Sequence, residues 1–246
     1  MTKRFWFVTV GAGVLGEDLA GLVLRAAERR GQGPSGARPQ RAAVSIACAL
    51  GPLGGAPPPV HDAVVCEWFA DGSHLARFED WLTSDAGQAA GAHAEGLREG
   101  GVHRVVVADE EVRRGADWLE RRWRAGGAVW KHMALAVRAE GLSPAEASAR
   151  WRAQAGQVGG APSRAPTVIP EEVRGRAYVQ NHPRPRAEGA WAYDAVNEVY
   201  FDDVEGLARR VAWFAAHADA VAADDTFGQS WFLATRETVC FDATRG

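Results

Sequence analysis

The segment HDAVVCEWFADGSHLARFEDWL, residues 61–82, aligns without a gap on YDAVNEVYFDDVEGLARRVAWF, residues 193–214, at a shift of 132 residues (193 minus 61). In each copy an alternating apolar run, an acidic turn and helically spaced apolar residues predict a strand followed by an amphipathic helix. The acidic turns at Asp71 and at Asp202–Asp203 are expected to cap these helices. The chain therefore contains an internal repeat, which decides its architecture.

The flanks of the repeat extend it to both ends of the chain. The preceding strands are predicted at residues 41–47 and 176–182, the following strands at 105–112 and 231–239, and an opening strand, loop and helix at 4–19 and 131–146. Each half therefore reads β-α-β-β-α-β, with residues 1–115 as the first repeat, 116–130 as a helical connection and 131–246 as the second repeat.

This element order is that of a ferredoxin-like unit, an antiparallel sheet with two helices on one face. A single half would leave the other face of its sheet uncovered. Two halves in one chain can pack sheet against sheet and close a space between them. The sequence therefore predicts an α+β protein of two tandem ferredoxin-like repeats that form an intramolecular pseudo-dimeric α/β barrel.

The composition is that of a globular protein, with 47% hydrophobic and 24% charged residues among 246. A formal net charge of -3 gives no electrostatic reason to expect nucleic acid or an anionic membrane as partner. No apolar run approaches the roughly 20 residues of a membrane-spanning helix. Three cysteines favour reduced thiols and a cytoplasmic location over a disulfide framework, and their spacing does not indicate a zinc site.

A glycine motif near the start resembles a dinucleotide-binding fingerprint. Gly11, Gly13 and Gly16 follow an apolar run and precede a helical pattern. The fingerprint also requires a carboxylate for the ribose about 20 residues further on. No acidic residue occurs between Glu28 and Asp62. A tight strand-to-helix turn is therefore the better interpretation, and we expect neither a nucleotide cofactor nor a metal.

Three segments of the second half carry a family resemblance: KHMALAVRAEGLSPAEASARW (131–151), RAYVQNH (176–182) and YDAVNEVYFDD (193–203). With them the second half resembles the EthD-like family of the dimeric α/β-barrel superfamily, and the resemblance reaches the first half only through the internal repeat. It implies a cofactor-independent enzyme of secondary metabolism that acts on aromatic or polyketide-type intermediates. Many relatives carry a histidine where this chain has Ala155, so no role of that histidine is carried over.

Side chains alternate along a strand, so we expect the apolar set to cover the helices and the other set to face the space between the sheets. In the second half the expected inward residues are His132, Ala134, Ala136, Arg138, Tyr178, Gln180, His182, Asp194, Val196, Glu198 and Tyr200. In the first half they are Phe5, Phe7, Thr9, Ala43, Ser45, Ala47, Asp62, Val64, Cys66 and Trp68. The titratable groups lie in the second half, which suggests one site per chain.

Four inward residues are predicted to be catalytic: Glu198, His132, His182 and Tyr178. Partial burial of a carboxylate in the middle of a strand is expected to raise the pKa of Glu198 and suit it to general acid or base catalysis, unless it forms an ion pair with Arg138. The two histidines are alternatively structural. Tyr178 can donate to a developing enolate or simply fill the barrel.

Eight further residues are predicted to bind the substrate. Arg138 is expected to hold an anionic group or to cap a loop, and Asp194 is alternatively a turn residue, as its twin Asp62 would be. Cys66 is alternatively a small buried hydrophobe. The remaining polar and apolar lining residues are Gln180, Tyr200, Trp68, Phe5 and Phe7.

The functional hypothesis is an enzyme that cyclises or dehydrates a small hydrophobic molecule by general acid–base catalysis. The first alternative is a cofactor-free monooxygenase on the same fold. The second is a binding protein without catalysis. The protein is expected to be a monomer with an internal pseudo-dimer, or a homodimer, and apolar pockets with a few polar groups are typical of small-molecule sites.

Overall fold

The structure is a computed structural model that describes residues 1–10, 16–50, 60–91, 102–159, 165–186, 188–222 and 225–244. Gly11 and Gly13 of the glycine motif lie outside the described residues, and Gly16 begins a helix. None of the described helices combines the length and the apolar character that crossing a bilayer requires.

The described part of the first half contains four strands and three helices. They are β1 (Thr2–Thr9), α1 (Gly16–Gly31), β2 (Arg41–Ala47), β3 (Ala63–Phe69), α2 (Gly72–Thr83), α3 (Asp85–Ala89) and β4 (Val102–Arg114). Asp71 caps α2, because its side chain accepts a hydrogen bond from the backbone N–H of His74. The predicted helix cap at this acidic turn is therefore confirmed.

The second half begins after a connecting helix, α4 (Ala116–Ala125). It contains β5 (Ala128–Arg138), α5 (Pro144–Ala153), the short strands β6 (Gln157–Val158) and β7 (Thr167–Val168), the 3-10 helix η2 (Glu171–Val173), β8 (Ala177–Pro183), β9 (Ala195–Phe201), α6 (Val204–Ala216), α7 (Ala218–Ala222) and β10 (Phe227–Asp242). Asp203 caps α6 by accepting from the N–H of Gly206, which confirms the second predicted cap.

The eight long strands form one closed antiparallel barrel in the order β1-β3-β2-β10-β5-β9-β8-β4. Each half keeps the ferredoxin-like order, β4-β1-β3-β2 and β10-β5-β9-β8, and the halves join where β2 pairs with β10 and β4 pairs with β8. The predicted intramolecular pseudo-dimeric barrel is confirmed. Its closure pairs every strand edge within one chain.

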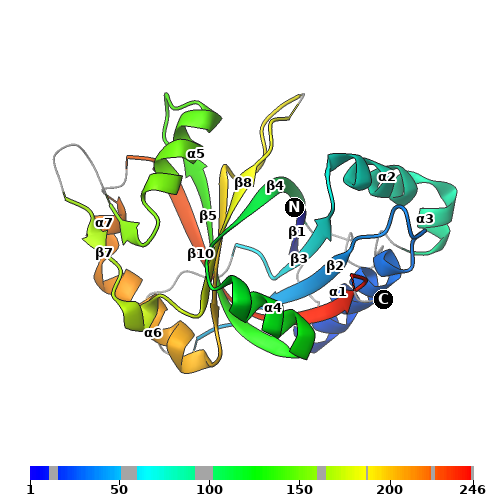
Figure 1. Ribbon diagram of the computed structural model, residues 1–246, viewed down its shortest axis with the longest axis horizontal. Coiled ribbons are helices and arrows are strands. Elements are labelled where there is room, and N and C mark those ends of the chain that lie inside the picture. The colour runs from blue at the N-terminus through cyan, green and yellow to red at the C-terminus, as the bar shows by residue number, and fades with distance from the viewer. Residues whose placement is uncertain are drawn as a thin grey trace.

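The helices of the two halves lie on opposite sides of the barrel. Figure 1 shows α1, α2 and α3 on one side and α5, α6 and α7 on the other, with α4 between them. Trp123 of α4 packs into the cluster that fills the barrel, and Trp118 of the same helix lies 5.9 Å from Tyr200, measured between ring centroids. The connection therefore covers one end of the barrel.

The strand registers show which residues of the two halves are equivalent. Lys3 is opposite Trp68 and Lys131 is opposite Tyr200, and Tyr200 is the residue 132 positions after Trp68. Lys131 is therefore the counterpart of Lys3, whereas the sequence alignment placed it on Arg4. A shift of one residue turns every side chain of a strand to the other face. The expected facing of β5 and β8, which placed their apolar side chains against the helices, is also wrong, because Met133 and Leu135 lie in the barrel core and Val179 is opposite Glu198.

Candidate functional site

The inside of the barrel is a packed core. Its apolar cluster draws side chains from strands of both halves, from α4 and from the segment before β9: Phe5, Phe7, Ala43, Val64, Cys66, Trp68, Val106, Ala108, Trp123, Met133, Leu135, Tyr193, Val196 and Leu233. Phe5, Phe7, Cys66 and Trp68 face inward as expected, but they pack against Met133 and Leu135, which were assigned to the helix side. The predicted ligand space between the two sheets is largely filled.

A network of buried charges crosses this core. Lys131 Nζ donates to Glu198 Oε1 at 2.8 Å and also bonds Glu237, while Lys3 bonds Glu198 from the other half. Arg122 Nη2 donates to the second oxygen of Glu237 at 2.7 Å. All five side chains are at most 5% exposed. Buried carboxylates and cations thus neutralise one another, as burial of charge requires.

This network corrects the expectation for Glu198. Burial alone would raise the pKa of its carboxyl, but Lys131 and Lys3 hold the pKa below its ordinary value. The carboxylate also accepts from Asn181 at 3.0 Å and from Tyr200 Oη at 3.2 Å. Glu198 is therefore ionised and fully engaged, and its ion-pair partners are two lysines rather than Arg138.

The same network contains a possible set of metal ligands. Side-chain atoms of Cys66, Glu198 and Glu237 lie within 4.8 Å of one another. The ammonium of Lys131 lies among them, bonded to both carboxylates and 3.9 Å from Cys66 Sγ. Burial raises the pKa of Cys66 to about 12, so the thiol is protonated. Lysine supplies the positive charge that a metal would bring.

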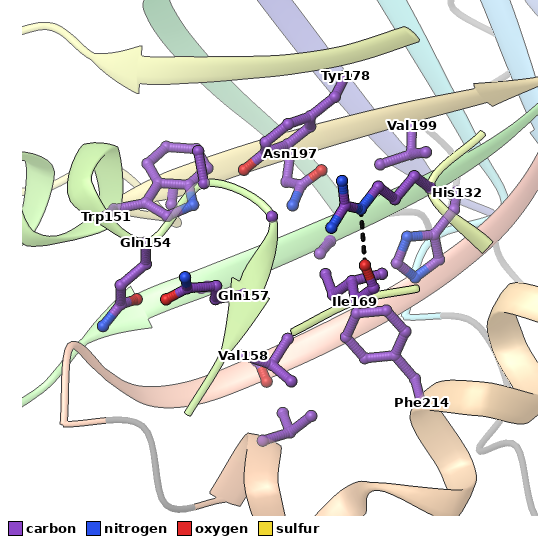
Figure 2. Close-up of a pocket in the computed structure, with 18 of the residues that line it drawn as sticks. His132, Trp151, Gln154, Gln157, Val158, Ile169, Tyr178, Asn197, Val199 and Phe214 are labelled. Carbon is purple, nitrogen blue, oxygen red and sulfur yellow. Dashed lines mark hydrogen bonds between the residues drawn. The ribbon is translucent and has the colours of Figure 1, made fainter. Parts of the chain in front are cut away.

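A cavity lies outside the barrel, between the second-half sheet and the segments that cover it. Its volume is about 290 Å³, at the low end for a small-molecule site. Figure 2 shows Tyr178 and Asn197 on the sheet side, Trp151, Gln154 and Gln157 at one end, and His132 and Phe214 at the other. Ala134, Ala136 and Ala195 leave the floor open because their side chains are short. We take this cavity as the candidate active site.

His132 faces this cavity, and its hydrogen bond fixes its tautomer. Arg210 Nε donates to His132 Nδ1 at 3.1 Å. Burial, reinforced by the charge of Arg210, holds the pKa of His132 well below its ordinary value, so the ring is neutral. A neutral ring that accepts at Nδ1 carries its proton on Nε2. Nε2 is buried and has no hydrogen-bond partner among the described residues, so its N–H is an unpaired donor in the wall of the cavity.

Tyr178 offers a second donor. Its oxygen accepts a hydrogen bond from Gln180 Nε2 at 2.8 Å, which leaves the phenol proton for another acceptor. Burial raises the pKa of Tyr178, so the phenol keeps this proton. Tyr178 and His132, two of the four predicted catalytic residues, therefore line the same cavity as hydrogen-bond donors.

The other predicted polar residues lie elsewhere. His182 is beneath α5, where its ring packs on Trp151 and Nδ1 lies 2.7 Å from Ser148 Oγ. Gln180 donates to the carbonyl of Trp151 at 3.0 Å. His182 and Gln180, like His132 and Tyr178, lie on the helix side of the sheet and not inside the barrel. The facing predicted for these four side chains is therefore wrong. Arg138 and Asp194 form an ion pair with each other at the start of β9.

Most residues of the cavity were not predicted, among them the polar residues Arg210 and Asn197. Arg210 lies on the buried face of α6 with Leu207 and Phe214, three and four positions away, and a charged residue at such a position is a signal that sequence alone contains. Asn197 is the polar residue in an otherwise apolar, helix-facing set on β9. Its Oδ1 has no partner among the described residues. Ala155 also lines the cavity.

Comparisons with known proteins identify the fold and not a family. The sequence matches no protein-family model, and no curated protein is similar enough to count as a relative. An anthrone oxidase-like protein superposes with a TM-score of 0.52 at 12% identity, over 98% of this chain and 94% of its own. A protein from Lactobacillus acidophilus NCFM, provisionally assigned as a monooxygenase, gives a TM-score of 0.49 at 9% identity over 97% and 96%.

A variant of chlorite dismutase from Candidatus Nitrospira defluvii gives a TM-score of 0.42 at 11% identity, over 95% of this chain and 90% of that one. The likeness to the anthrone oxidase-like protein extends along almost the whole of both chains. Together with the closed strand order, it shows that this chain has the fold of the dimeric α/β-barrel superfamily, with both halves of the barrel in one polypeptide.

Proposed function

We propose that this protein is a cofactor-independent enzyme that binds a hydrophobic aromatic or polyketide-type molecule in the second-half cavity and stabilises its enolate or phenolate. One observation carries the proposal: two neutral side chains with an unpaired donor, Tyr178 and His132, line one cavity together with apolar and cationic side chains. Donors held in place in a site that excludes water stabilise negative charge that develops on a substrate oxygen.

The choice of reaction follows from what these groups can do with a proton. The histidine is neutral and accepts at Nδ1 from Arg210, the tyrosine is protonated, and none of the described lining residues is a carboxylate. Such a site favours a substrate acidic enough to ionise with little help from a base. Oxygenation of the substrate's own anion fits this better than dehydration, which needs a base and an acid in turn.

The oxygenation balances without a further reagent. An activated methylene loses a proton, its carbanion adds to dioxygen, and the resulting peroxide loses water to leave a carbonyl, so that methylene plus dioxygen gives ketone plus water. Of the structural neighbours, the anthrone oxidase-like protein bears a name consistent with this class of substrate.

The test is oxygen uptake with anthrone as the probe, together with mass spectrometry of the product. We expect one dioxygen consumed per ketone formed. The Tyr178→Phe variant should lose roughly 100-fold to 1,000-fold in kcat, as removal of an oxyanion donor does. Tyr193→Phe is the matched control, because it removes a tyrosine hydroxyl that lies outside the cavity.

Two other outcomes would assign a different function. A product that has lost one water, formed without oxygen uptake, would support the cyclase or dehydratase hypothesis. Binding of the aromatic probe with no change in its mass, in the wild type and in Tyr178→Phe alike, would identify a binding protein.

A further inference from the structure

The charged side chains that line the second-half cavity are all cationic. They are Arg113, Arg114, Arg174 and Arg210, and none of the described lining residues is Asp or Glu. Arg113 has a partner outside the cavity, since it forms an ion pair with Glu111. The other three arginines form no ion pair among the described residues, and Glu171, whose charge acts on Arg114, does not line the cavity.

Apart from the bond from Arg210 Nε to His132 Nδ1, the hydrogen bonds of these three arginines go to backbone carbonyls. Arg210 Nη1 donates to Val173 O at 2.9 Å, Arg174 Nε donates to Ile169 O at 2.6 Å, and Arg114 bonds the carbonyl of Arg174. The Nε of Arg114 is buried without a hydrogen-bond partner among the described residues. Arg210 is only 3% exposed. A buried guanidinium is normally paired with an anion.

The first half shows what such a pairing looks like in this fold. Arg4 and Arg30 are buried on the helix side of the first sheet, and both donate to the fully buried Glu67, at 2.7 and 3.2 Å. The residue 132 positions after Glu67 is Val199, which lines the cavity. The first half therefore contains its own counter-ion, and the second half has an apolar side chain at the same place.

The buried arginine that faces the helices lies on the strand in the first half and on the helix in the second half. Arg210 is the counterpart of Phe78, 132 residues earlier, and His132 is the counterpart of Arg4 by the strand registers. In the first half the guanidinium of Arg4 lies 5.8 Å from the ring of Phe78. An arginine therefore contacts a ring across the strand and the helix in both halves, whereas only the first half has the carboxylate of Glu67 beside it.

We infer that the ligand of the second-half cavity carries a carboxylate, which occupies beside Arg210 and Arg114 the place that Glu67 occupies in the first half. The inference rests on the proposed function for the identity of the site. Guanidinium groups bind carboxylates through two parallel N–H donors, so a planar acid suits them. Trp151, Phe214 and Phe232 would contact an apolar body of one or two rings, which the volume of about 290 Å³ admits.

A purely structural role for the arginines makes a different prediction. If they only fasten residues 169–174 to the sheet, their donors are satisfied by carbonyls and the cavity has no preference for charge. Acid and neutral ligands of one shape would then bind equally.

The first experiment is calorimetric titration of the wild-type protein at neutral pH with 2-naphthoate, 2-naphthamide and 2-naphthyl phosphate. We expect the carboxylate to bind roughly tenfold or more tightly than the isosteric amide, with a preference that weakens as salt is added. Equal affinities, or no binding of naphthoate, would overturn the inference. Tighter binding of the phosphate ester would also overturn it, since the site would then be built for a dianion.

The second experiment places the missing counter-ion in the protein. In Val199→Glu, the new carboxylate stands where Glu67 stands in the first half and should lower naphthoate affinity at least tenfold. Val199→Gln is the matched neutral control and should keep the preference for acid over amide. Equal effects of the two variants would contradict the inference. Both readouts are binding constants, so they hold or fail independently of any turnover of anthrone.

Discussion

His61 and Tyr193 occupy equivalent positions in the two halves, 132 residues apart, and are hydrogen-bonded to each other with His61 Nε2 2.6 Å from Tyr193 Oη. Thr9 Oγ1 donates to the carbonyl of Val60 and lies 2.8 Å from His61 Nδ1, which therefore donates to it. His61 Nε2 must then accept the phenol proton. The internal two-fold relation passes between these two side chains, and the bond joins the halves.

Removing this hydroxyl should weaken the barrel. In Tyr193→Phe the buried Nε2 of His61 loses its donor, so we expect the free energy of unfolding to fall by about 1–3 kcal/mol. Urea denaturation of Tyr193→Phe, His61→Phe and the double variant measures the coupling. Strictly additive losses would show that the two rings do not stabilise each other.

Replacement of Glu198 should alter stability and not ligand binding. Glu198→Gln leaves Lys3 and Lys131 in the core with one carboxylate fewer, and breaking such a buried pair typically lowers the free energy of unfolding by about 3–5 kcal/mol. Where the variant folds, its affinity for an aromatic ligand should equal that of wild type, because Glu198 does not line the cavity. A large loss of affinity at unchanged stability would return Glu198 to the active site.

Two alanine substitutions distinguish the cavity from the core. Ala134→Leu should fill the cavity floor and abolish binding of 2-naphthoate with little change in stability. Ala43→Leu adds the same atoms inside the packed barrel and should destabilise the protein by about 1–3 kcal/mol through overpacking. Calorimetry and chemical denaturation of both variants check this. Unaffected binding in Ala134→Leu would place the ligand elsewhere.

Stability should fall as the solution is acidified from about pH 6.5 to about pH 4. Burial lowers the pKa of His61 and of His182 to about 4, and it also holds the pKa of His132 well below its ordinary value. In this window the unfolded chain binds protons that the folded chain does not. Each histidine therefore contributes a slope of up to about 1.4 kcal/mol per pH unit. Urea denaturation across the window measures the slope, which His182→Gln should reduce; a stability independent of pH would contradict the assignment.

The repeat was enough to predict the fold, because the 61–82 and 193–214 segments place a strand and a helix at matching points of each half. Register was harder. Aligning Arg4 with Lys131, instead of Lys3 with Lys131, missed by one residue the equivalence of the two lysines. Both lysines are buried charges that neutralise Glu198.

The packed interior of the barrel explains why the polarity of a side chain did not predict which face of its strand it lies on. Expecting the apolar set to meet the helices assumes a polar space between the sheets, yet that space is filled by Phe5, Met133 and other apolar side chains. Apolar residues thus occur on both faces of β5, so the alternation of polar and apolar residues does not distinguish the helix side from the barrel side. The cavity is open because residues such as Ala134 have small side chains, and a pattern of polar and apolar residues does not predict where such a space lies.

The covalent link through α4 has an evolutionary consequence. In a dimer of identical subunits every substitution appears in both copies, so two cavities must be gained or lost together. Here Trp6 stands where the other half has Ala134, and Val65 stands where it has Asn197. With both copies in one chain, the first half can carry large side chains at these positions while the second half retains the cavity. Saturation of the protein with ligand should therefore follow a simple hyperbola with one ligand per chain.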